Sequence, residues 1–267
     1  MEKEIKTIED FASYVQTGLE KTLPDIIDEI TSDCKAGLEN ATDVNIGEIK
    51  DFSLVKNKIC YRLINKESDS KLLSTIPHRN FYGLAVIYYV NLASITDKDL
   101  YPVNVTNDLA GFWGVDETQL YELAHKNTPR LFKGCVTPLC DTLKSMAGLP
   151  VQNPDDRMYI PFKNFNIIIT YENNSTYVAT NMCKTYGSTV IMYDGLLKSV
   201  SRLLGSFFVL PSSIHELLII PAERENAERI SRIVKEDNCT IVSKKDVLSD
   251  VYCWYYSAKD HTFEIIK

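Results

Sequence analysis

The chain has 267 residues, of which 45% are hydrophobic and 24% are charged, and its formal net charge is -7 at pH 7. This composition is typical of a folded globular protein and excludes a fibrous or disordered chain. The 36 acidic residues outnumber the 29 basic ones and no basic stripe is visible, which argues against nucleic-acid binding. No apolar run approaches the ~20 residues of a membrane-spanning helix, and no secretory signal is present. We therefore expect a cytoplasmic protein that does not bind membranes.

The N-terminal segment is predicted to be helical. Apolar side chains recur every three or four residues from Ile5 to Leu23 and again from Ile27 to Leu38, as on the buried face of a helix. Pro24 suits the first turn of the second helix. We expect residues 1–43 to form a helical hairpin, followed by a single mixed domain over residues 44–267.

Alternating apolar residues predict the first strands of this domain, at 44–49 and 59–63. The segment 81–92 (FYGLAVIYYVNL) is apolar on both faces, which fits either a buried strand or a buried helix. Its content of Val, Ile and Tyr favours the strand.

A capping box of Asp116 and Gln119 predicts the start of a helix, which Pro129 should end or kink. Pro and polar residues then predict a surface loop. This loop is expected at 148–161. The patterns after it predict strands at 166–170 and 189–192, and then a helix at 196–204 that Asp194 caps and Gly205 ends.

The last segment of the chain is predicted to return to the sheet. Its patterns indicate strands at 207–210 and 217–220, a helix at 227–234, and a hairpin of strands 251–256 and 262–266. Strands and helices alternate with short connections, which predicts an α/β or α+β fold with a mixed sheet and packed helices.

Sequence motifs for catalysis are missing. The chain has no phosphate-binding loop, no dinucleotide-binding glycine fingerprint and no nucleophile elbow. His215 and Glu216 begin a zinc-binding HExxH pattern, but Ile219 stands where the second histidine is needed. The seven cysteines are widely and irregularly spaced, so we expect reduced, mostly buried thiols. We assign no catalytic residue, no cofactor and no metal site.

The segment with the most chemical potential contains Ser212, Ser213, His215 and Glu216. A hydroxyl, an imidazole and a carboxylate are the ingredients of nucleophilic or acid–base catalysis. The alternative is structural: Ser213 and Glu216 suit a turn or a capping box, with His215 hydrogen-bonded beneath a loop. We favour the structural interpretation, because working triads are assembled from distant segments.

Two further polar clusters are candidate binding residues. His78 and Arg79 precede the apolar segment at 81–92, and Asn127 and Arg130 end the helix that Asp116 caps. An arginine can grip a carboxylate or phosphate through its fork of donors. More often such residues hold a loop by bonding to backbone carbonyls, and we favour that role here.

Four strings together carry a resemblance: IPHRNFYGLAVIYYV (76–90), LAGFWGVDETQLYELAHKNTPRLF (109–132), SFFVLPSSIHELLIIP (206–221) and DVLSDVYCWYYS (246–257). In this order, with the signatures NTPRLF and LPSSIHE, they resemble an uncharacterised bacterial family, a domain of unknown function found in Firmicutes and especially in gut Clostridia. The resemblance implies a shared fold and a bacterial cytoplasmic origin, and it implies no reaction.

These observations favour a non-enzymatic interaction or regulatory protein. The alternative is a small-molecule-binding or hydrolase-like protein that uses Ser213, His215 and Glu216. The expected partner is therefore a protein or a small molecule. Nothing in the sequence selects an oligomeric state, although the last hairpin or the N-terminal apolar stripe offers a surface for a dimer.

Overall fold

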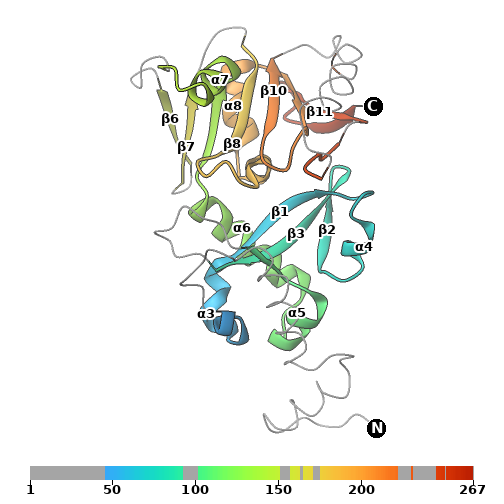
Figure 1. The fold of residues 1–267 in the computed structure, drawn as a ribbon. Helices are drawn as coiled ribbons and strands as arrows, with labels where there is room; N and C mark the ends of the chain where they lie inside the picture. The colour runs from blue at the N-terminus through green and yellow to red at the C-terminus, as the bar shows by residue number, and fades with distance from the viewer. Residues whose placement is uncertain are drawn as a thin grey trace, which may run out of the picture.

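Figure 1 shows the fold in a computed structural model, which describes residues 46–92, 102–150, 157–162, 165–170, 175–221, 230, 245–249 and 251–266. The described chain forms two β-sheets with helices packed on them, so the fold is mixed α/β. The predicted N-terminal helices lie outside the described residues. So does the predicted helix at 227–234, apart from Ile230, which is helical and buried.

The smaller sheet is antiparallel and has β3 at its centre. The prediction of a strand in the 81–92 segment is confirmed, and this strand is buried along almost its whole length. Tyr82 and Gly83 form a two-residue turn with φ of 41° and 89°, the positive values that tight hairpins need. The strands are β1 (Ile59–Asn65), β2 (His78–Phe81), β3 (Leu84–Asn91) and β4 (Pro102–Asn104).

Helices cover the smaller sheet, and the longest of them, α6, packs on β1. The capping box at its start is confirmed: the Asp116 carboxylate accepts the Gln119 N–H at 2.8 Å, and the Gln119 side chain accepts the Asp116 N–H at 3.0 Å. The helical elements here are η1 (Ile46–Lys50), α3 (Phe52–Val55), η2 (Lys56–Lys58), α4 (Ser70–Leu73), α5 (Asn107–Trp113) and α6 (Glu117–Leu131).

One prediction in this region was wrong, and another was met only loosely. Pro129, which was expected to end or kink α6, lies within its last turn, and the helix ends two residues later at Leu131. A proline near the end of a helix removes a single backbone bond, and the buried Thr128 hydroxyl holds this turn by accepting the Tyr61 N–H at 3.1 Å. The predicted strand at 44–49 is instead the turn η1 from Ile46 onward, because no neighbouring strand pairs with it among the described residues.

The larger sheet is mixed, with the order β12-β11-β9-β10-β8-β5-β7-β6, and only its β5–β7 pair is parallel. It confirms the strands predicted near 166–170, 207–210 and 217–220, and the C-terminal hairpin. Its strands are β5 (Gly134–Pro138), β6 (Arg157–Phe162), β7 (Phe165–Thr170), β8 (Tyr177–Asn181), β9 (Phe207–Leu210), β10 (Leu217–Pro221), β11 (Cys253–Tyr256) and β12 (Phe263–Ile266).

The connections of the larger sheet differ from the predictions in two places. The predicted 148–161 loop is too long, because β6 begins at residue 157. Within the described residues β6 lies at the edge of the sheet, a position where a proline such as Pro161 is tolerated. The run at 189–192 is not a strand but part of the buried 3-10 helix η4 (Gly187–Met192). Because its apolar residues are buried on every side, their pattern carried no helical periodicity.

The predicted helix at 196–204 is confirmed as α8 (Leu196–Leu204), and it ends at Gly205, whose φ is 71°. The predicted cap was wrong. Gly195 occupies the N-cap position, while the Asp194 carboxylate lies 3.1 Å from His125 Nε2. Another helix beside the larger sheet, α7 (Leu139–Met146), leaves Leu143 and Met146 exposed.

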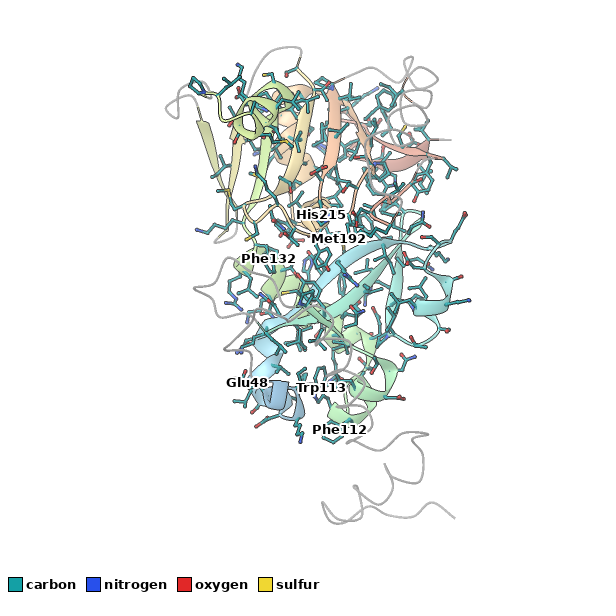
Figure 2. All side chains as sticks on the ribbon, in the orientation of Figure 1. Glu48, Phe112, Trp113, Phe132, Met192 and His215 are labelled. Carbon is teal, nitrogen blue, oxygen red and sulfur yellow. The ribbon has the colours of Figure 1, made fainter. Side chains whose placement is uncertain are left out.

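One buried apolar cluster joins the two sheets. It includes Tyr61 and Tyr88 of the smaller sheet together with Val190 and Trp254, which belong to the larger-sheet layer. In Figure 2, Phe132, Met192 and His215 lie at the level where the two sheets meet. The junction between the sheets is therefore packed core.

Candidate functional site

An open groove of about 690 Å³ lies beside the smaller sheet, between the end of α4, the start of β2 and the helices α5 and α6. Apolar side chains and backbone form much of its surface, and polar side chains lie among them. Its lining includes the apolar Leu73, Ile76, Ala110, Gly111 and Val115 and the polar Ser74, His78, Asn107, Asp116 and Glu117.

His78 enters this groove because β2 begins directly after Pro77, and the side chains of a strand alternate between its two faces. His78 and Asn80 are exposed, whereas Arg79 and Phe81 are half-buried on the opposite face. His78 Nδ1 lies 3.0 Å from the Ile76 carbonyl oxygen and donates to it. In the neutral ring Nε2 then carries the lone pair and can accept a hydrogen bond.

Arg79 forms an ion pair with Glu117 at the wall of the groove. Its Nε and one terminal nitrogen donate to the two Glu117 oxygens at 2.7 and 2.8 Å, a forked arrangement that favours a fixed geometry. The Tyr88 hydroxyl donates to the same carboxylate. The guanidinium also lies 3.5 Å from the centre of the Tyr121 ring, which adds a cation–π contact.

Burial and hydrogen bonding shift the pKa values of Glu117 and Tyr88 in opposite directions. Burial raises the pKa of the Glu117 carboxyl, but the hydrogen bonds from Arg79 and Tyr88 outweigh burial, so the pKa falls below its usual 4.5. Burial, followed by the bond to Glu117, raises the pKa of Tyr88. Glu117 is therefore an ionised acceptor at neutral pH, and Tyr88 is a protonated donor.

We expect Glu117→Gln to lower the free energy of unfolding at pH 7 by about 1–2 kcal/mol, as for other partly exposed charge-assisted bonds. Because the folded-state pKa of Glu117 is depressed, this contribution is complete above the unfolded-state pKa and disappears as the pH falls through the folded-state pKa. Urea unfolding of both proteins from neutral pH to about pH 3 measures the difference. Glu122→Gln, on the exposed side of the same helix, is the control. Equal pH dependence for wild type and Glu117→Gln would contradict the prediction.

Asn127 and Arg130 lie away from this groove, at the end of α6. Asn127 Nδ2 donates to the carbonyls of Lys56 and Ile59 at 2.8 and 3.0 Å, and Arg130 donates to the Asn57 carbonyl at 2.7 Å. These bonds hold the chain just before β1 against the helix.

The Ser212 to Glu216 segment connects β9 to β10, and its serines bond to backbone. Ser212 N donates to the Leu210 carbonyl at 2.9 Å. Ser213 is buried, and its hydroxyl accepts the His215 N–H at 3.0 Å, which closes a local turn. Among the described residues no hydrogen bond joins the Ser213 hydroxyl to the imidazole, or the imidazole to Glu216. The structure therefore keeps these three groups close without linking them as a relay.

His215 instead faces residues that sequence reasoning did not identify. Its ring lies parallel to that of Tyr186, with 6.1 Å between ring centres, and its Nδ1 accepts the Tyr186 N–H at 3.4 Å. The Tyr186 hydroxyl in turn accepts from Arg62 of β1 at 2.6 Å. Arg62 and Tyr186 are 124 residues apart, and no local pattern in the sequence connects them.

Three further features of the described residues concern metal binding, a buried thiol and membrane-spanning helices. No group of three His, Cys, Asp or Glu residues in the described ranges is arranged to hold a metal ion. Burial raises the pKa of the Cys60 thiol to about 12, so this thiol is protonated at neutral pH. No helix within the described parts of the chain has the length and apolar character needed to cross a membrane.

The fold and the site define a mixed α/β protein with an open groove beside an ion-paired network. The chain belongs to DUF5688, a family of unknown function, whose sequence model matches residues 5–257. This match includes most of the N-terminal segment. Neither the curated proteins nor the solved structures contain a significant match to the chain.

Proposed function

We propose that the protein is a non-enzymatic interaction protein whose groove binds a peptide segment of a protein partner. The observation that carries this proposal is the composition of the groove. Its apolar residues, such as Ile76 and Val115, suit an apolar side chain, while the Asp116 carboxylate and the free lone pair of His78 accept hydrogen bonds. A peptide with an apolar residue next to a lysine or arginine offers both features.

Among the described residues no strand pairs with the outer edge of β2, which supports a peptide ligand. In the two-residue hairpin, Phe81 and Leu84 form the hydrogen-bonded pair next to the turn, and Arg79 and Val86 form the following one. The backbone groups of His78 and Asn80 therefore point away from β3. An extended peptide can pair with these groups as an additional strand while its side chains enter the groove.

A small molecule is the second candidate ligand, because about 690 Å³ lies within the usual range of small-molecule pockets. The hydrolase-like alternative has less support. Ser213 is buried and its hydroxyl bonds to backbone, so it is not prepared as a nucleophile by the neighbouring imidazole.

Gly111 offers a direct test of the groove. It lies in α5 at the groove surface, and a Cβ added there meets nothing within 4 Å. The side chain introduced by Gly111→Trp should fill the groove without disturbing the core. The helix should tolerate this change, because tryptophan has a higher helix propensity than glycine. We expect peptides selected from a random phage-displayed library on the immobilised protein to contain an apolar residue beside a basic one. We expect Gly111→Trp to weaken their binding by at least about tenfold.

The controls are Gly111→Ala, which leaves the groove open, and Met146→Trp, which adds the same bulk to the exposed surface of α7. Both should bind the selected peptides as the wild type does, measured by fluorescence polarisation. Failure to enrich any peptide, or equal binding by Gly111→Trp, would exclude the groove as a peptide site. Binding of acidic peptides alone would contradict the proposed chemistry.

We also propose where the protein comes from and where it acts. The sequence resemblance supports a bacterial protein of the Firmicutes that acts in the cytoplasm. The acidic composition supports a role without nucleic acid or membrane binding. We propose further that residues 44–267 form one domain, which is supported by the apolar cluster shared between the two sheets.

A further inference from the structure

Arg62 is a partly buried cation without an acidic partner among the described residues. Its terminal nitrogens donate to the Tyr186 hydroxyl at 2.6 Å and to Asn104 Oδ1 at 3.1 Å, and its buried Nε–H has no hydrogen-bond acceptor. No carboxylate oxygen of the described residues lies within 4.0 Å of this guanidinium, whereas Arg79 has both oxygens of Glu117. A buried donor without an acceptor is costly, and such a group points to a partner supplied from outside the chain.

The side chains around Arg62 present further donors. Tyr186 and Asn104 each accept from Arg62, which leaves the Tyr186 O–H and the Asn104 Nδ2 groups to donate. His215 Nδ1 accepts the Tyr186 N–H, so the ring proton of the neutral imidazole is on Nε2. All four residues are partly exposed and within reach of solvent. A set of donors around an arginine selects an oxyanion.

The loop that carries Tyr186 is held in an unusual conformation. Lys184 and Tyr186 have φ of 54° and 51°, and a non-glycine residue in this left-handed region costs about 1–2 kcal/mol. Asn181 stabilises the loop by accepting the Cys183 N–H at 3.0 Å and donating to the Thr185 carbonyl at 2.8 Å. Strain of this kind persists where the surrounding structure over-determines it, as at binding sites.

We propose that Arg62, Asn104, Tyr186 and His215 form a binding site for the carboxylate or phosphate group of a small ligand. Arg62 and Asn104 come from the smaller sheet, while Tyr186 and His215 come from loops of the larger-sheet layer. A bound oxyanion would therefore link the two layers and stabilise their junction. The site is separate from the groove, and it does not rest on the peptide-binding function proposed above.

The test uses the full chain with inorganic phosphate and with acetate as separate probes, each compared with sodium chloride at equal ionic strength. Binding is followed by the imidazole C–H resonances of His215 and by the melting temperature. We expect at least one probe to shift the His215 resonance in a saturable way and to raise the melting temperature. The probe that binds more tightly identifies which of the two groups the natural ligand carries.

Arg62→Gln should lower the affinity for that probe by at least about tenfold, and Arg62→Lys should restore it only in part, because lysine keeps the charge but not the fork. Arg202→Gln, which removes an exposed arginine from α8, is the matched control and should bind as the wild type does. If Arg62→Gln does not fold, Tyr186→Phe tests the same site by removing one donor. The proposal would be overturned if the wild-type protein showed no saturable binding. It would also be overturned if Arg62→Gln and Tyr186→Phe bound the probe with the affinity of the wild type.

Discussion

Trp254→Ala is expected to lower the free energy of unfolding by about 3–5 kcal/mol, the range for removing a large aromatic side chain from a core. Trp254 is fully buried on β11, and its ring packs against Phe81 and Phe263 with ring centres 6.0 and 5.4 Å away. Its indole N–H also donates to the Tyr82 carbonyl at 2.9 Å, in the turn of the smaller sheet. The substitution therefore leaves a cavity and removes a bond between the two layers. Urea unfolding followed by circular dichroism measures the loss.

Trp113 provides the matched control for this prediction. It is the only other tryptophan, it is half-buried at the end of α5, and its N–H also donates to a backbone carbonyl, that of Ile49, at 2.8 Å. Trp113→Ala should therefore cost clearly less than Trp254→Ala. Equal costs would mean that Trp254 has no special place in the core. If residues 44–267 form one domain, both variants should still unfold in a single transition.

The second large effect is expected for Gly187→Ala. A Cβ on Gly187 would overlap the Thr180 hydroxyl and the His215 carbonyl oxygen, and it would lie 2.8 Å from the Asn181 backbone nitrogen. Two of these three atoms belong to the backbone, so rotating one side chain cannot remove the clash. We expect a loss of about 3 kcal/mol or more in the free energy of unfolding, at the upper end for overpacked cores.

Gly134→Ala is the control for this substitution. Gly134 is also buried, but a Cβ there meets its nearest atoms, on Tyr193 and Val190, at 3.5 Å, an ordinary contact distance. It should change the free energy of unfolding by less than about 1 kcal/mol. If Gly187→Ala were no more destabilising than Gly134→Ala in urea unfolding, the close packing of β8, η4 and the His215 segment would be wrong.

Elements with strong local signals were predictable. The capping box at Asp116 and Gln119 satisfies backbone N–H groups within one turn, so it acts wherever the helix lies. The apolar face of α8 and the positive φ at Gly205 are likewise local properties, and the end of that helix at Gly205 was predicted. β3 was predictable from its β-branched and aromatic residues, although its two-sided burial left a helix possible until the pairing with β1 was known.

The errors fall where neighbouring segments determine the local structure. η4 has apolar residues like those of a strand, but it packs against β8 and β1, and no described strand pairs with it. Asp194 is suited to cap α8, yet its carboxylate lies against His125 of another helix. Pro129 remains within α6 because the last turn is held by β1. In each case a contact between distant segments outweighs the local preference.

The candidate sites depended on such contacts even more. The sequence offered His78, Arg79 and His215 only as candidate polar residues, on the chemistry of their side chains. Their partners came from the folded chain: Glu117 reaches Arg79 across 38 residues, and Tyr186 reaches His215 across 29. Hydrogen bonds and ion pairs act over a few ångströms, so burial of the core must first bring these segments together. Composition and periodicity determine which residues are buried, and packing determines which polar groups meet.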